Sequence, residues 1–269
     1  CYSYVNFGEI VVSAAAQLVF DGHNDVLLKL YRAGGMGQAT SFVDGRSGAI
    51  DLPKSKVGGF GGGFFAVFVP SPTDLDHKFQ EMTKDTYDLE LPEAIDCSDA
   101  LPVVASQIAI LLELERMGAL NICRSVAEMR AVFAAGKMAA IMHMEGAEAI
   151  DADLHMLDVL HAAGLRSIGP VWSRPTIYGH GVPFRFPSSP DTGDGLSDHG
   201  LALIKRCNVL KIMVDLSHLN EAGFWDVARY SEAPLVATHS NAHAITQHSR
   251  NLTDDQLRAI AASDGMVGL

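Results

Sequence analysis

Several features that mark particular classes of protein are scarce in this sequence. The four cysteines among its 269 residues form no Cys-x-x-Cys pair and no dense framework, which argues against a disulfide scaffold and suits a reducing compartment. No basic patch stands out in a chain of formal net charge −12, so nucleic acid is not expected as a partner. No apolar run approaches the roughly 18 residues of a spanning helix, so no membrane span is expected.

The amino-terminal end also lacks the pattern of a targeting signal. The chain begins with Cys1 and has no basic segment before the apolar stretch 10–16. We therefore predict no signal peptide and expect a cytoplasmic protein. A start at cysteine in place of methionine is also compatible with a fragment.

Apolar residues, in contrast, are plentiful. Hydrophobic residues make up 48% of the chain, which is enough to bury a large core. The length matches the roughly 250 residues of a single (β/α)8 barrel. We therefore expect one domain over residues 1–269.

Glycine and proline divide the chain into a repeating strand–helix pattern. Short apolar runs predict strands at 18–20, 64–69, 137–144, 166–171, 211–216, 234–238 and 265–269. Apolar spacing and capping residues predict helices at 99–117, 125–135, 154–163, 197–207, 221–230 and from 253 onward. Strands that alternate with helices indicate a parallel sheet in an α/β fold.

The number of predicted strands favours a (β/α)8 TIM-type barrel that lacks its last strand and helix, so the domain is partial at its carboxyl end. A doubly wound open sheet is the alternative, which is disfavoured because no Gly-x-Gly-x-x-Gly follows an early strand. A barrel without its last strand has two open edges. We therefore expect poor stability or pairing with another chain, for example as a homodimer.

Metal-binding side chains follow four of the predicted strands. The residues are His23 and Asp25, Glu145, His218, and His239. His23 and Asp25 are two positions apart, so on an extended backbone they point to the same side. The carboxyl ends of barrel strands meet at one face, so all five side chains are expected to converge there.

Three imidazoles and two carboxylates form a ligand set for two divalent metal ions bridged by one carboxylate. Zinc fits this set, and manganese and cobalt are alternatives. Two metals about 3.5–4 Å apart can hold one water between them and lower its pKa from about 15.7 towards 7. The resulting hydroxide is a nucleophile, and the same cations polarise a carbonyl, so the chemistry suits hydrolysis of an amide or ester.

Five motifs give the chain a resemblance to a known family. They are Asp21-Gly22-His23-Asn24-Asp25, Met144-Glu145-Gly146, Val214-Asp215-Leu216-Ser217-His218, Thr238-His239-Ser240-Asn241-Ala242 and Ser249-Arg250-Asn251-Leu252-Thr253-Asp254. In content, order and spacing they resemble the motifs of the membrane (renal) dipeptidase family over residues 19–269. The long loop around Trp172-Ser173-Arg174-Pro175 is similar to that of the bacterial members.

The resemblance implies a function for each motif. His23 and Asp25 would bind one zinc ion, His218 and His239 the second, and Glu145 would bridge both and serve catalysis. The substrate would be a small dipeptide, often with a D-residue at its carboxyl end. Arg250 matches the family arginine that receives the terminal carboxylate, and a guanidinium suits that role because it binds carboxylate through a two-pronged fork.

The sequence departs from the family pattern at two points. Trp172 occupies the position of a histidine that helps to hold the substrate, and an indole donates one hydrogen bond but takes no positive charge. His180, later in the same loop, is a candidate replacement. The family's last strand supplies an aspartate near the metals that is expected to shuttle a proton, and this sequence ends before that strand.

Other polar residues have supporting interpretations. His143 is predicted to be structural. Asp215 is either an acceptor that orients a metal-bound histidine or a packed strand-end residue. Loops 71–98 and 174–196 are expected to form the side-chain pockets.

Two other functions remain open from the sequence. The same metal site could serve hydrolysis of another small amide, a lactam or a lactone. Alternatively, the chain could be a catalytically silent metal-binding barrel.

Overall fold

Parallel strands alternate with helices in the computed structural model, which describes residues 18–72 and 80–269. The main sheet has the order β1-β2-β5-β6-β8, and β4 also pairs with β5. Its strands are β1 (Val19–Asn24), β2 (Phe60–Phe68), β4 (Asn121–Ile122), β5 (Ala139–Glu145), β6 (Leu165–Gly169) and β8 (Met213–Val214). The stretch 10–16 and residues 73–79 of the loop 71–98 lie outside the described residues.

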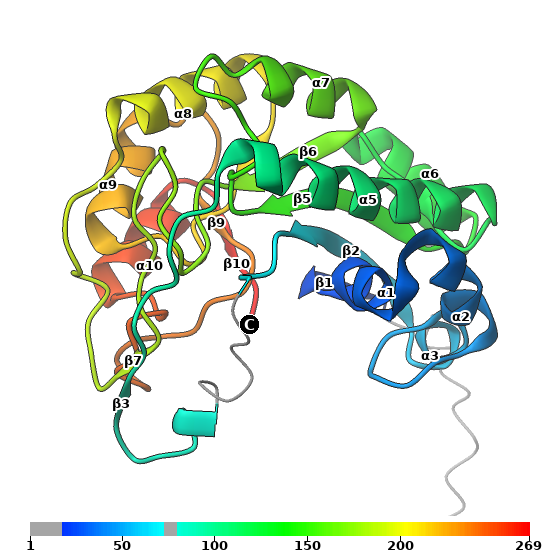
Figure 1. The fold of residues 1–269 in the computed structure, drawn as a ribbon, viewed down its shortest axis with the longest axis horizontal. Coiled ribbons are helices and arrows are strands. Elements are labelled where there is room, and N and C mark those ends of the chain that lie inside the picture. The colour runs from blue at the N-terminus through cyan, green and yellow to red at the C-terminus, as the bar shows by residue number, and fades with distance from the viewer. Residues whose placement is uncertain (1–17, 73–79) are drawn as a thin grey trace, which may run out of the picture.

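Past β8 the sheet continues through one isolated bridge and one short ladder. Asp215 forms a parallel bridge with Val236, which begins β9 (Val236–Ala237), and β9 pairs in parallel with β10 (Met266–Val267). Figure 1 shows the strands as an open arch with the carboxyl-terminal end beneath it. The fold is thus an α/β half-barrel, and the nearly complete (β/α)8 barrel expected from the sequence is not confirmed.

Short strands account for this difference. β8, β9 and β10 have two residues each, where the sequence predicted runs of five or six. Within residues 18–72 and 80–269, β1 forms a ladder only with β2, and β10 only with β9. The ladder therefore does not close around the barrel axis.

Helices lie along the outer side of the arch and at its amino-terminal end (Figure 1). They are α1 (Val26–Gly34), η1 (Gly35–Gln38), α2 (Ala39–Asp44), α3 (Leu52–Val57), α5 (Cys97–Arg116), α6 (Val126–Ala134), α7 (His155–Ala163), α8 (Asp198–Leu210), α9 (Glu221–Tyr230) and α10 (Asp254–Ala262). Ser125, Ser197, Asn220 and Thr253, each just before a helix, accept a backbone hydrogen bond in the first turn. Capping therefore sets where these helices begin.

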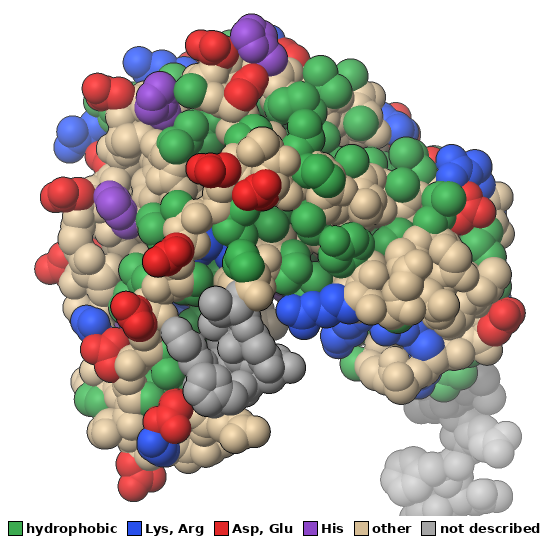
Figure 2. All heavy atoms as spheres, in the orientation of Figure 1, with side chains coloured by type: hydrophobic (Ala, Val, Ile, Leu, Met, Phe, Trp, Pro, Cys, Tyr) green, Lys and Arg blue, Asp and Glu red, His purple; other side chains and the backbone are tan. Residues whose placement is uncertain are grey.

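Helix α5 bears on the expectation that no segment spans a membrane. Its 20 residues include an 18-residue window of mean hydropathy 1.5, so by length and composition alone it is able to cross a membrane. Its inner face packs into the core through Ala100, Val104 and Leu111. Figure 2 shows apolar side chains over its outer face too, and these raise its hydropathy. The pattern fits a helix that covers a core.

The two long loops meet each other. β3 (Tyr87–Asp88) lies in the segment 71–98 and pairs antiparallel with β7 (Arg185–Phe186) in the segment 174–196. The Tyr87 ring also lies 5.8 Å from the ring of His248, between centroids. These segments therefore form one structural unit beside the strand ends.

We predict that Gln107→Leu destabilises the protein. Gln107 is fully buried, and it accepts from the backbone N–H of Phe68 at 3.0 Å and donates to the Phe68 carbonyl at 2.6 Å. Leucine would leave both backbone groups buried without a partner, at about 1–3 kcal/mol each. Urea unfolding should show this loss, and Ser106→Ala on the exposed face of the same helix should show almost none. Equal stability of the two variants would contradict the prediction.

Candidate metal centre

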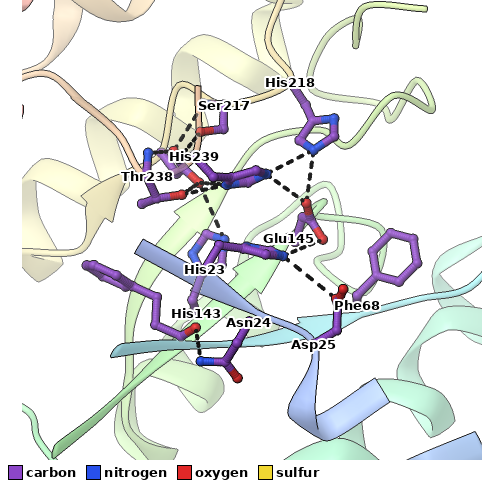
Figure 3. A network of polar contacts seen from close by, with 12 residues as sticks. His23, Asn24, Asp25, Phe68, His143, Glu145, Ser217, His218, Thr238 and His239 are labelled. Atoms are coloured by element: carbon purple, nitrogen blue, oxygen red, sulfur yellow. Dashed lines mark hydrogen bonds and ion pairs between the residues drawn. The ribbon is translucent and has the colours of Figure 1, made fainter. Parts of the chain in front are cut away.

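Glu145 lies at the middle of a cluster formed by strand ends. It is the last residue of β5, and its carboxylate is almost completely buried. Its Oε2 lies 3.6 Å from His23 Nε2, while its Oε1 lies 3.1 Å from His218 Nε2 and 3.4 Å from His239 Nε2. Figure 3 shows the three imidazoles pointing at this carboxylate. Its two oxygens therefore face two different groups of side chains.

The first group comes from the end of β1. His23 Nε2 lies 3.7 Å from Asp25 Oδ1, and Asp25 is the residue before α1. Both side chains point to the same side, as their spacing predicts. Asp25 is 43% exposed, so this end of the cluster opens to solvent.

The second group comes from the ends of β8 and β9. The Nε2 atoms of His218 and His239 are 3.1 Å apart, and both approach Glu145 Oε1. Two ring nitrogens this close repel unless a proton or a cation lies between them. The donor set therefore fits a metal ion at this position.

Glycine lets the two groups meet. A Cβ on Gly22 would lie 2.0 Å from the carbonyl oxygen of Thr238, so only glycine allows β1 to approach the end of β9 this closely. As a result the rings of His23 and His239 are 4.1 Å apart between centroids. The ligand atoms of His23, Glu145 and His239 all lie within 4.8 Å of one another.

Charge in the cluster favours a bound cation. For His23, burial lowers the pKa, but the carboxylates of Glu145 and Asp25 outweigh it and raise the pKa to about 9. Burial, together with the charge of Arg250, holds the pKa of His218 well below its usual value and lowers that of His239. Burial opposes ionisation of Glu145, yet the facing imidazoles, His23 foremost, hold its pKa well below its usual range. The cluster thus combines an ionised, buried carboxylate with neutral imidazoles at His218 and His239, whereas His23 holds a proton that a bound cation would displace.

A polar network supports His239 from behind. Its Nδ1 lies 2.9 Å from Thr238 Oγ1, and that hydroxyl donates to Asp215 Oδ2 at 2.6 Å. Asp215 Oδ1 also accepts from the backbone N–H groups of Thr238 and Ser217. Asp215 therefore reaches the histidine through Thr238, since its own Oδ2 is 4.0 Å from His239 Nδ1.

His143 is fully buried beneath the cluster. Its Nδ1 lies 2.8 Å from Ser167 Oγ and its Nε2 lies 3.5 Å from Asp215 Oδ2. Burial lowers its pKa to about 4, so the ring is neutral at physiological pH. It packs against His23 edge-on, with ring centroids 6.0 Å apart. Its position fits the predicted structural role.

Arg250 lies at the His239 end of the cluster. Its Nη2 donates to the carbonyl of His239 at 3.0 Å and its Nη1 to Ser240 Oγ at 3.4 Å. Burial lowers its pKa to about 10, so it stays charged at neutral pH. The guanidinium has further donors that these two bonds do not use.

The two other predicted substrate residues have different positions. Trp172 is buried, with its ring centroid 5.8 Å from that of His218, so it lies beside the cluster. His180 is exposed and lines a separate cavity of about 510 Å³ with Asp88 and Arg185. Among the described residues, the structure records no hydrogen bond or ion pair between the His180 ring and the cluster.

Sequence reasoning missed a buried ion pair next to the site. Arg174 and Glu148 are 2.7 Å apart, between Nη2 and Oε1, and both side chains are almost fully buried. It also missed Ser173, whose hydroxyl contacts His218. The available signal for the ion pair was Glu148, a charged residue between two alanines in Ala147-Glu148-Ala149.

A parallel half-barrel with imidazoles and carboxylates gathered at its strand ends is typical of a metal-dependent hydrolase. Comparison with known proteins places it more narrowly. The chain belongs to the membrane dipeptidase family, peptidase family M19, which it matches over residues 11–269. It is thus an enzyme of a metallo-dipeptidase family, as the five motifs indicated.

Individual relatives are similar over most of this chain. A metallo peptidase from Rhodobacter sphaeroides, solved with a phosphinate mimic of the dipeptide L-Ala-D-Ala, is 56% identical with a TM-score of 0.91, over 94% of this chain and 73% of that one. The structure of dipeptidase AC is 56% identical with a TM-score of 0.90, over 94% of this chain and 72% of that one. An uncharacterised Acinetobacter calcoaceticus protein from the PQQ-III 3′ region is 40% identical over 93% of this chain and 79% of its own length.

We predict that Gly146→Ala is unusually destabilising. Gly146 follows Glu145 with φ +87°, and a Cβ there would lie 2.4 Å from Oε2 of Glu148, whose other oxygen, Oε1, is paired with Arg174. Gly136 is the matched control, because its φ is +65° and a Cβ there would meet nothing within 4 Å. Both alanines carry the left-handed backbone cost of roughly 1–2 kcal/mol.

Only Gly146→Ala adds the steric contact, expected to cost about 1–3 kcal/mol more. Chemical unfolding of the metal-free protein measures the difference between the two variants. If both lose the same stability, the Glu148 carboxylate is not fixed against Gly146.

Proposed function

We propose that this chain hydrolyses small dipeptides with two divalent metal ions, most simply zinc, bridged by Glu145. The observation that carries the proposal is the placement of the two Glu145 oxygens. One faces His23, next to Asp25, and the other faces His218 and His239. These residues would hold one ion at each oxygen. When bound, such a pair generates a nucleophile from water near neutral pH and polarises the substrate carbonyl.

Arg250 orients the substrate in this proposal. It is charged, lies at the His239 end and retains free donors, so it binds the terminal carboxylate of a dipeptide. The scissile carbonyl then lies over Glu145, and the amino-terminal residue extends towards His23 and Asp25. Trp172 forms a wall beside His218.

A relative supports the choice of a small substrate. The L-Ala-D-Ala mimic in the Rhodobacter relative supports a dipeptide, with a D-residue accepted at its carboxyl end.

Glu145→Ala tests the bridging role. Because Glu145 faces both groups, its loss is expected to remove or weaken both metals and to lower kcat/KM for L-Ala-D-Ala about a thousand-fold, which corresponds to roughly 4 kcal/mol. Metal content by mass spectrometry and the hydrolysis rate are measured together. Glu232→Gln on the surface is the control and should change neither. Full metal content and a normal rate in Glu145→Ala would refute the proposal.

Arg250→Met tests the carboxylate role. Hydrogen bonds to charged groups are worth about 1.5–3 kcal/mol, so kcat/KM for a dipeptide with a free carboxylate should fall roughly 10–150-fold. The carboxamide form of the same dipeptide should lose little. Arg258→Met, on the exposed face of α10, should leave both substrates unaffected. An equal loss on both forms would mean that Arg250 does not bind the carboxylate.

A further inference from the structure

The loop after β6 carries a hydroxyl that contacts His218. Ser173 Oγ lies 3.0 Å from His218 Nδ1, and both residues are buried. The opposite ring nitrogen, Nε2, faces Glu145 and His239. Ser173 and Glu145 therefore lie at the two ends of the same imidazole.

The chemistry of imidazole indicates which group donates in this hydrogen bond. A neutral histidine that offers the lone pair of Nε2 to a cation carries its proton on Nδ1, and that proton needs an acceptor when it is buried. Ser173 Oγ is the acceptor within reach of His218, and Thr238 Oγ1 is the corresponding acceptor for His239. The Nδ1 of His23, in contrast, is buried without a hydrogen-bond partner within residues 18–72 and 80–269. Within the described residues, hydroxyl groups therefore hold the rings of His218 and His239 from the side opposite Glu145, and no such group holds His23.

His218 also needs this support for conformational reasons. Its φ of +69° lies in the left-handed region, which a non-glycine residue occupies only where its surroundings hold it there. Its carbonyl accepts from the backbone N–H of Val182 at 2.9 Å, and its ring contacts that of Trp172. The hydroxyl of Ser173 supplies the polar restraint on the ring.

Ser173 is itself fixed by its neighbour Arg174, whose side chain is fully buried. The guanidinium donates to Glu148 Oε1 at 3.0 and 2.7 Å, to Val69 O at 2.7 Å and to Ser71 Oγ at 2.9 Å. These acceptors follow β2 and β5, so Arg174 ties the loop after β6 to the ends of both strands. The carbon at its centre lies 5.6 Å from the ring centroid of Trp172. The backbone that presents Ser173 is therefore held on several sides.

We propose that Ser173 is a positioning residue that sets the tautomer and orientation of His218, and that the buried Arg174–Glu148 pair keeps Ser173 in place. This inference rests on the proposed function, because it takes His218 as a metal ligand. It assigns a role to three residues that none of the five motifs contains.

Zinc affinity tests the role of Ser173. The metal-free protein is titrated with zinc against a chromophoric chelator, which reports the two affinities without any substrate. Removal of such a supporting contact typically costs 10–100-fold in metal affinity, so Ser173→Ala should weaken one of the two sites by about that factor. Thermal unfolding of the metal-free variant should stay near that of the wild type. Ser55→Ala is the control, since this buried serine in α3 has a hydroxyl with no hydrogen-bond partner among residues 18–72 and 80–269.

A second pair of variants isolates the hydroxyl. Ser173→Thr and Ser173→Val add similar bulk, but only threonine keeps the acceptor, so threonine should bind zinc more tightly than valine. If the wild-type protein binds two ions and hydrolyses dipeptides, equal zinc affinities for the threonine and valine variants would overturn the positioning role alone. A wild-type zinc affinity in Ser173→Ala would overturn it in the same way. A wild-type chain that binds zinc at neither site would overturn the proposed function as well.

Discussion

The rest of the site depends on one electrostatic constraint, a buried carboxylate faced by three imidazoles. Burial alone would protonate Glu145, because a charged group in a low-dielectric interior is unfavourable. His23, His218 and His239 reverse this by lying within 3.6 Å of its oxygens. The same geometry makes the carboxylate and the free ring nitrogens a strong site for a cation.

That constraint requires support from the surrounding protein. Two of the imidazoles are held from behind by hydroxyls, His218 by Ser173 and His239 by Thr238. Each hydroxyl is in turn connected to a buried charge, through the neighbouring Arg174 in one case and through Asp215 in the other. Buried charges persist when they are paired and hydrogen-bonded, so these networks restrict where the rings can point.

The half-barrel explains why such distant residues meet. Parallel strands place their carboxyl ends along one edge, and the arch brings β1 against the end of β9 at Gly22. The antiparallel pairing of β3 with β7 joins the two loop segments beside this edge. The cluster therefore lies where strand ends, loops and helix starts converge, as in other α/β proteins.

Much of this was predictable from local sequence. Runs of apolar residues located the strands, and capping residues located four helix starts. The histidines and carboxylates that follow the strands indicated the cluster, because the direction of a side chain on a strand depends on its nearest neighbours in the sequence. The five motifs predicted the family, because their order and spacing along the chain are more specific than any single residue.

Tertiary structure decided the rest. The length of β8 to β10 depends on partners in the ladder, so a seven-strand pattern produced an open arch and not the nearly closed barrel. The sequence assigned no role at the site to Ser173, Glu148 or Arg174, because their buried polar contacts join segments that are 26 and 45 positions apart. His180 and Trp172 share one loop, yet only Trp172 lies beside the cluster. Local sequence determined which side chains follow the strands, and only packing between distant segments determined which of them face one another.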